Sequence, residues 1–261
     1  MIVIKFGGHA MSDKNGVFAK AIATAISNGV SPVIVHGGGP QIDTALTSAG
    51  IVSHLIGGFR YTTPQIMDVV ERVLSNEVGP AVAKSLRTCG VNAVAMSGRN
   101  SGTLFAKPLK TLVDGTSVDL GRAGDISRVN TKVILSMLAD SQIPVISPVA
   151  GDETSSQAFN VNGDIAAAAI AGALDADALI IMTDVEGIYR SWPDKSSLIS
   201  TITQAELASL RSTFEKGMAP KVKACLDAIS AGAKAVRIID GTNPDALADA
   251  LAGKGGTLVT K

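Results

Sequence analysis

Two lysines occupy positions where a positive charge is hard to explain without a negatively charged ligand. Lys5 lies within the apolar run IVIKF at residues 2–6, where a lysine is costly to bury without an anion. Lys221 lies at the start of a predicted helix, where its charge opposes the helix dipole. Each position also has a simpler explanation, in which Lys5 points to solvent from an edge strand and Lys221 is a solvated surface side chain.

Two glycine clusters follow predicted strands early in the chain. Gly7 and Gly8 end the first apolar run, and VIVHGGGP carries a second cluster at residues 37–39. Glycines between a strand and a helix expose backbone N–H groups, and the helix N-terminus adds partial positive charge, so such a turn suits a phosphate or a carboxylate. A tight strand-to-helix turn is the alternative. Neither GxxxxGK(S/T) nor GxGxxG is present, which argues against a P-loop protein and a dinucleotide Rossmann site.

Polar residues also mark the ends of predicted elements in the second half of the chain. Asp164 in NVNGDIAAA precedes a predicted helix, and an N-cap is the commonest role of an aspartate there. Asp184 ends the strand in LIIMTDVEGI, which turns at Gly187. At the C-terminal end of a parallel strand, such side chains would reach the crevice where α/β proteins usually bind ligands.

The elements that must position these residues alternate regularly. Short segments rich in Val and Ile predict strands at residues 2–6, 32–35, 91–98, 143–149, 177–185 and 235–240. Helical spacing predicts helices at residues 17–27, 40–49, 63–89 with an interruption near Gly79-Pro80, 132–140, 165–174, 204–212, 218–231 and 244–251. Residues 104–125 predict hairpins. Because the strands are apolar on both faces, we expect an α/β fold with a mainly parallel, helix-flanked sheet.

Composition excludes several classes of protein. The 261 residues carry 23 basic and 23 acidic side chains, so no net field attracts nucleic acid or an anionic membrane. No apolar run is long enough to span a bilayer, and the N-terminus does not have the features of a signal peptide. Cys89 and Cys225 are isolated, which indicates reduced thiols and a cytoplasmic protein. The histidines and cysteines form no metal-binding pattern, so no metal ligand is predicted.

Taken in order, the motifs resemble those of the amino acid kinase family. The segments are IVIKFGG, VIVHGGGPQI, GGFRYT, NAVAMSG, VISPVA, NVNGDIAAA, LIIMTDVEGI, GMAPKVKACLDA and GGTLV, and they cover nearly the whole chain. The resemblance implies a three-layer αβα sandwich. It also implies an N-terminal lobe, residues 1–165, for acyl amino acid binding and dimerisation, and a C-terminal lobe, residues 166–261, for ATP binding. The implied reaction moves the γ-phosphoryl group of ATP to a carboxylate.

The resemblance also implies a role for particular residues. Lys5 and Lys221 would contact the transferring phosphoryl group, and Asp164 would hold both ammonium groups without acting as a base. Backbone N–H groups of Gly7 and Gly8 would bind phosphate. The implied substrate-binding residues are Gly38, Gly39, Arg60 and Asn160. The implied nucleotide-binding residues are Asp184, Val185, Gly187, Ile188, Tyr189, Lys216, Gly217 and Met218. Mg²⁺ would be held mainly by nucleotide phosphates and water.

The motifs also bear on the acceptor and on the oligomeric state. HGGGPQI and GGFRYT fit better the branch of the family that phosphorylates N-acetyl-L-glutamate in arginine biosynthesis. Residues 191–200, SWPDKSSLIS, look more like a relative that acts on carrier-linked aminoadipate or glutamate. A non-catalytic sensor with this fold would be expected to lack a phosphate-handling residue, whereas Lys5, Asp164 and Lys221 are all present. Since the first strand begins at Ile2, we expect a homodimer with little or no sensitivity to arginine. His9 is interpreted as a turn residue.

Overall fold

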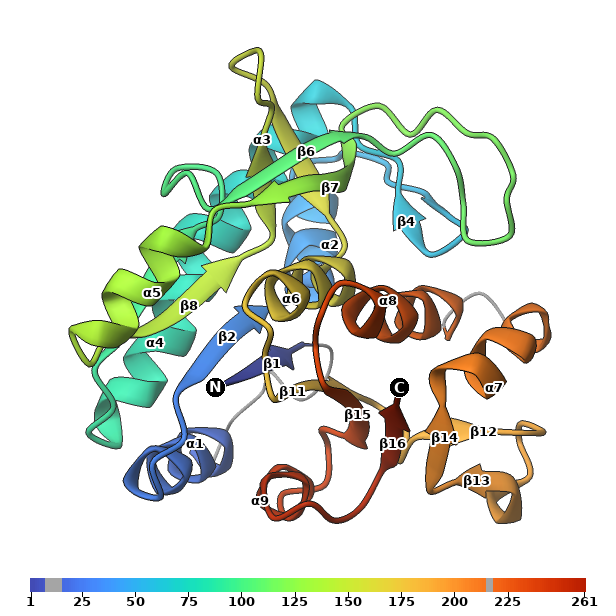
Figure 1. The fold of residues 1–261 in the computed structure, drawn as a ribbon. Helices are drawn as coiled ribbons and strands as arrows, with labels where there is room; N and C mark the ends of the chain where they lie inside the picture. The colour runs from blue at the N-terminus through green and yellow to red at the C-terminus, as the bar shows by residue number, and fades with distance from the viewer. Residues whose placement is uncertain (8–15, 215–217) are drawn as a thin grey trace.

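The computed structural model describes residues 1–7, 16–214 and 218–261. An eight-stranded sheet forms its centre (Figure 1). Its strands are β1 (Ile2–Phe6), β2 (Pro32–His36), β5 (Ala93–Ser97), β8 (Ile143–Ser147), β11 (Ala178–Thr183), β14 (Thr201–Thr203), β15 (Ala235–Asp240) and β16 (Thr257–Thr260). They lie in the order β14-β16-β15-β11-β1-β2-β8-β5. Neighbouring strands are parallel except β15 and β16, which pair antiparallel.

Helices cover both faces of the sheet, because alternate strand residues point to opposite sides. On β1, Ile4 belongs to the apolar core on one side and Val3 to the core on the other. The Ile4 side holds α1 (Val17–Ser27), α2 (Gly39–Ser48), α3 (Pro64–Glu71), a π-helix at Arg72–Val78, α4 (Gly79–Thr88) and α9 (Ala246–Leu251). The Val3 side holds α5 (Thr131–Ala139), α6 (Gly163–Ala173), α7 (Gln204–Ser209) and α8 (Ala219–Ser230). The predicted three-layer αβα fold is therefore confirmed.

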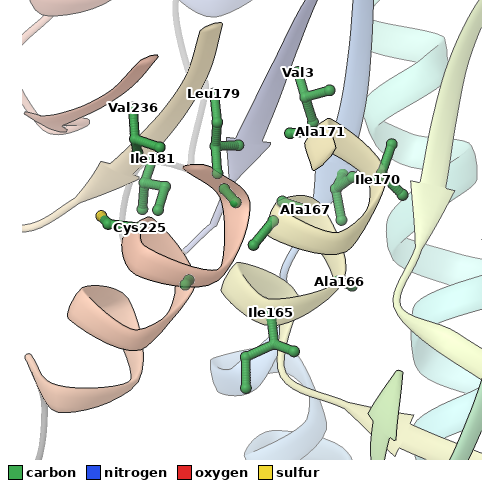
Figure 2. Packing of buried hydrophobic residues seen from close by; sticks show 14 of the residues in the cluster. Val3, Ile165, Ala166, Ala167, Ile170, Ala171, Leu179, Ile181, Cys225 and Val236 are labelled. Carbon is green, nitrogen blue, oxygen red and sulfur yellow. The ribbon is translucent and has the colours of Figure 1, made fainter. Parts of the chain in front are cut away.

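The contact between α6 and α8 depends on small side chains. Figure 2 shows the two helices side by side, with Ala167 and Ala171 on α6 and Cys225 on α8 among the buried residues. A Cβ atom added at Gly172 would lie 2.3 Å from the Cβ of Ala231, so a larger residue there would force the two segments apart. This packing brings the first turns of α6 and α8 close to each other.

A second, smaller sheet was only partly predicted. The strands β6 (Leu104–Pro108), β7 (Ala123–Val129), β9 (Val149–Gly151) and β10 (Ala158–Val161) close into a barrel. The predicted hairpin is present as the antiparallel pair β6-β7. The strand predicted at residues 143–149 divides at Pro148 into β8 and β9, which belong to different sheets, because proline cannot donate a ladder hydrogen bond.

Two short hairpins complete the described strands. They are β3 (Leu55–Ile56) with β4 (Phe59–Arg60), and β12 (Ile188–Tyr189) with β13 (Leu198–Ile199). The predicted helix after Thr63 is interrupted near Gly79-Pro80, as expected. The interruption is the π-helix and not a break in the chain of helical turns, and the N–H of Gly79 bonds to the carbonyl of Leu74. No described helix is both long and apolar enough to cross a membrane.

Candidate active site

Lys5 reaches the site because β1 lies in the middle of the sheet. The strand pairs with β11 on one side and β2 on the other, so the solvent-facing edge position considered for Lys5 is wrong. Lys5 is on the same face as Val3, near the C-terminal end of the strand, and is only 7% exposed. That face is covered by α6, and the lysine therefore points towards the first turn of this helix.

Asp164 lies in that first turn and is 4% exposed. It is not the N-cap, because Asn162 takes this role and its side-chain oxygen accepts from the N–H groups of Asp164 and Ile165 at 2.8 and 3.3 Å. The carboxylate of Asp164 is thus free to point inward. Lys5 Nζ lies 3.0 Å from its Oδ1, and Lys221 Nζ donates to its Oδ2 at 2.9 Å.

The two contacts of the carboxylate differ in quality. The bond from Lys221 is a well-formed hydrogen bond. The contact with Lys5 is a close ion pair, and Oδ1 of Asp164 is left without an aligned hydrogen-bond donor among the described residues. Both ammonium groups are thus held against the same carboxylate at nearly equal distances.

The pKa values of Asp164 and Lys221 are shifted in the directions that keep both groups charged. Burial raises the pKa of Asp164, but the Lys5 and Lys221 ammonium groups outweigh burial and hold that pKa well below its usual range. Burial lowers the pKa of Lys221, but Asp164 and the more distant Asp184 raise it, and the net shift is upward. Two cations therefore share one anion, and the cluster keeps one positive charge in surplus. Such a cluster attracts an anionic ligand.

Glycines border this cluster where a larger residue would not fit. A Cβ atom at Gly7 would lie 2.7 Å from Lys5 Nζ, and one at Gly38 would lie 2.4 Å from Leu74 Cδ2. Gly38 is also the N-cap of α2 and has no side chain to bond the helix end. Because the first N–H groups of a helix have no partner within it, the start of α2 is suited to bind an anion.

Arg60 forms the other end of the site. Its Nη2 lies 2.7 Å from Oδ1 of Asp43, and its Nη1 donates to the hydroxyl of Ser53. The Arg60 side chain is 8% exposed, whereas that of Asp43 is 59% exposed. The guanidinium group is therefore fixed in the wall of the site, with a planar fork of donors that matches a carboxylate.

One pocket of about 330 Å³ joins these features. It is lined by all seven residues predicted for catalysis and substrate binding: Lys5, Gly38, Gly39, Arg60, Asn160, Asp164 and Lys221. Gly7 lies against Lys5 at its edge. Residues from β1, α2, β4, β10, α6 and α8 thus meet at one place, as the predicted site requires.

The residues predicted to bind the nucleotide do not line this pocket in the described part of the chain. Ile188 and Tyr189 are buried, and Gly187 packs tightly against Thr257, whose hydroxyl accepts from the N–H of Ile188. Val185 is half-buried, Asp184 is exposed, and Met218 is the N-cap of α8. The predicted residues Gly8, Lys216 and Gly217, and also His9, lie outside the described residues.

Sequence reasoning missed three residues that shape the site. Asp43 follows Gly39 by four residues on α2, so both lie on one helix face. Thr62 follows Arg60 by two residues in extended chain, which puts both on one side. These spacings were available in the sequence. Ser53 comes from the loop before β3, and no sequence pattern marks it.

Comparison with known proteins agrees with this geometry. The model of the amino acid kinase family matches residues 1–240. The chain belongs to the amino acid kinase family. An acetylglutamate kinase of Arthrobacter sp. (strain FB24) is 46% identical over 253 residues, which are 94% of this chain and 82% of the relative. An acetylglutamate kinase of Nocardia farcinica (strain IFM 10152) is 42% identical and covers 100% of this chain and 87% of its own length.

The family fold is also seen among solved structures. A protein of Streptococcus mutans UA159 superposes with a TM-score of 0.83 at 30% identity, covering 99% of this chain and 98% of that one. The likeness thus extends over both halves of the central sheet.

Proposed function

We propose that this protein transfers the γ-phosphoryl group of ATP to the side-chain carboxylate of N-acetyl-L-glutamate, giving N-acetyl-L-glutamyl 5-phosphate. The observation that carries the proposal is the convergence of Lys5 and Lys221 on Asp164 in a pocket that Arg60 also lines. The relatives named acetylglutamate kinase support this choice of acceptor.

The chemistry requires charge to be neutralised rather than a proton to be removed. A carboxylate acceptor is already ionised near neutral pH, so no general base is needed. Two anions must approach each other, and the oxygens of the moving phosphoryl group carry negative charge during transfer. The proposed role of Lys5 and Lys221 is to contact these oxygens, with backbone N–H groups of Gly7, Gly8, Gly38 and Gly39 as further donors.

Asp164 is proposed as a positioning residue. A carboxylate whose pKa lies well below its usual range is a poor proton acceptor. Its two oxygens instead hold the two ammonium groups at 3.0 and 2.9 Å. Without this carboxylate, the two lysines would repel each other and move apart before the substrates bind.

Arg60 and Asn160 are proposed to bind the acceptor. Arg60 presents a guanidinium group in the pocket wall and suits the second carboxylate of N-acetyl-L-glutamate. Asn160, with Gly38 and Gly39, lines the same pocket. The part of the molecule that reacts would then lie against the lysines, with its other end fixed by Arg60.

ATP is proposed to bind mainly to residues 166–261, with residues 1–165 binding the acceptor. The proposed contacts are Asp184, Val185, Gly187, Ile188, Tyr189, Lys216, Gly217 and Met218. Mg²⁺ supplies further neutralisation of phosphate charge when bound. No three described His, Cys, Asp or Glu side chains form a metal-binding group, so we propose that nucleotide phosphates and water hold the ion.

The segment at residues 191–200 does not favour a different acceptor. It contains the turn after β12, a short 3-10 helix at Lys195–Ser197 and strand β13, and none of its residues lines the pocket. We also propose a homodimer that works in the cytoplasm. The cysteines Cys89 and Cys225 are unpaired, which agrees with a reducing compartment. Size measurement by light scattering tests the dimer.

The deciding experiment is ATP turnover with N-acetyl-L-glutamate, with hydroxylamine to trap the acyl phosphate. L-Glutamate serves as the control because it differs only by the acetyl group. We expect trapped product with N-acetyl-L-glutamate and little with L-glutamate. Turnover with another acyl amino acid alone would overturn the proposed acceptor, and the absence of any trapped product across such a panel would overturn the proposed reaction.

A further inference from the structure

A buried hydroxyl group connects the two residues proposed to bind the acceptor. Thr62 is fully buried at 0% exposure and is not part of the pocket wall. Its Oγ1 donates to the backbone carbonyl of Arg60 at 2.8 Å, and Asn160 Nδ2 donates to the same Oγ1 at 3.1 Å. One hydroxyl therefore contacts both Arg60 and Asn160.

The direction of these hydrogen bonds follows from the donors available. A hydroxyl has a single proton, and a carbonyl oxygen only accepts. The hydroxyl of Thr62 donates its proton to the backbone carbonyl of Arg60, so its oxygen accepts the hydrogen bond from Asn160. The side of the Asn160 amide that faces Thr62 must therefore be its NH₂ group, because an amide oxygen there would face the oxygen of Thr62 without a proton between them.

Backbone contacts hold Thr62 and Asn160 in place. The N–H of Thr62 bonds to the carbonyl of Leu120 at 3.1 Å, and the carbonyl of Thr62 accepts from Arg122 at 2.7 Å. On β10, the flanking residues Phe159 and Val161 point into the apolar core, so Asn160 points to the opposite face. The remaining freedom of Asn160 is rotation of its amide, and its Oδ1 is bonded to no donor among the described residues.

We propose that Thr62 is a positioning residue that fixes the amide orientation of Asn160 for acceptor binding. The part of the test that measures turnover rests on the proposed function. With the NH₂ group held by Thr62, Asn160 offers its oxygen and one remaining N–H to the pocket. Without the hydroxyl, both amide orientations become available, and only one of them matches the acceptor. The affinity then falls with the fraction of molecules in the matching orientation.

The test compares Thr62→Val, which removes the hydroxyl at nearly constant shape, with Thr62→Ser, which keeps it. We expect Thr62→Val to raise KM for N-acetyl-L-glutamate about 2- to 10-fold, where twofold corresponds to equal populations of the two amide orientations and 10-fold to a mismatched orientation that is favoured by about the energy of one hydrogen bond. KM for ATP should change less than twofold, and Thr62→Ser should restore most of the acceptor affinity. A KM unchanged in Thr62→Val, or raised equally in Thr62→Ser, would overturn the proposal.

Thr103→Val is the matched control. Like Thr62, Thr103 is 0% exposed and does not line the pocket, but its hydroxyl is bonded to that of Ser101 and not to a residue proposed to bind the acceptor. Loss of the Thr103 hydroxyl should lower the melting temperature without changing KM for the acceptor. If Thr62→Val does not fold, Thr62→Ala is compared with Thr62→Ser in the same way. An equal rise of KM in Thr103→Val would show that general destabilisation is the cause.

A second measurement does not depend on turnover. In ¹⁵N-labelled protein, the side-chain amide of Asn160 is assigned through its disappearance in Asn160→Asp. We expect slow exchange of one amide proton with solvent in the wild type and in Thr62→Ser, and faster exchange in Thr62→Val. Equal exchange in the wild type and Thr62→Val would overturn the positioning role. Protection without any turnover would leave this role supported and count against the proposed function.

Discussion

Lys5 and Lys221 approach opposite oxygens of one buried carboxylate, that of Asp164, at 3.0 and 2.9 Å. The lysines come from β1 and α8, at opposite ends of the chain, and Asp164 from α6. The site thus depends on long-range packing of two helices against the centre of the sheet.

Lys221→Met should abolish phosphoryl transfer while preserving most of the nucleotide affinity. Methionine keeps the approximate length of the side chain but removes the charge that is proposed to stabilise the moving phosphoryl group. We expect kcat to fall about 10²- to 10³-fold, measured by the coupled release of ADP, with the Kd for ATP measured by calorimetry. The control is Lys223→Met on the same helix, whose partner is the neighbouring Asp227. If ATP affinity collapsed and the rate at saturation survived, Lys221 would be a binding residue.

Asp164→Asn should destabilise the protein in a way that anions reverse. The substitution keeps the shape but leaves the buried Lys5 and the half-buried Lys221 without their shared counter-ion, at a cost of about 3–5 kcal/mol. Urea denaturation should show this loss, and added ATP or pyrophosphate should stabilise the variant more than the wild type. Asp177→Asn is the control, because Asp177 pairs with the N-terminus and Lys234 at the exposed surface. Equal losses in both variants would contradict a special role for the buried cluster.

Arg60→Lys should weaken acceptor binding more than it slows the chemical step. Lysine keeps the charge but loses the planar pair of donors and the contacts with Asp43 and Ser53. We expect KM for N-acetyl-L-glutamate to rise about 10- to 100-fold, in line with the loss of one or two charge-assisted hydrogen bonds. Steady-state kinetics checks this. Arg128→Lys, which removes a guanidinium group stacked on Phe105 outside the pocket, should leave KM unchanged.

His36 should make the folded state sensitive to mild acid. Its side chain is fully buried, Nδ1 donates to the carbonyl of Gly37 at 2.7 Å, and Nε2 has no partner among the described residues. Burial lowers the pKa of His36 from 6.5 to about 4. Since the unfolded chain takes up the proton first, the stability from His36 is complete above pH 6.5 and is lost as the pH falls towards 4.

The variant His36→Gln tests this directly. Between pH 7 and pH 5, the wild type should lose about 2 kcal/mol more unfolding free energy than the variant. Urea denaturation at the two pH values measures the difference. His54→Gln, at an exposed position, should behave as the wild type. The same pH dependence in His36→Gln and the wild type would show that His36 is not the sensitive group.

The sequence was sufficient to predict the strands and turns that depend on short patterns of neighbouring residues. Strands such as β1 and β2 have continuous apolar runs, and the glycines at residues 37–39 mark the turn between β2 and α2. The predicted convergence of Lys5, Asp164 and Lys221 came from the family resemblance, because nothing local to the three residues states that they meet. The burial of Lys5 likewise depends on β1 being a central strand, which its own residues do not specify.

Other features were missed because their causes are distant in the chain. The strands β9 and β10 are short, and they are strands only because the barrel partners β6 and β7 lie beside them. The helix N-cap is Asn162, whereas the sequence offered Asp164 as the alternative candidate, since both side chains are suited to the role. Asn160 was predicted through the family resemblance, but its hydrogen bond to Thr62 spans nearly a hundred residues, which no short pattern encodes.

The position of Lys5 on the first strand has a consequence for biosynthesis. Ribosomes release the N-terminus first, so Lys5 emerges long before Asp164 and longer still before Lys221. A nascent chain that buried β1 before Asp164 was synthesised would enclose the ammonium group of Lys5 without a counter-ion, which is unfavourable. Final closure around β1 must therefore wait for α6 and α8, and an incompletely translated molecule would remain open to proteases instead of persisting as an inactive enzyme.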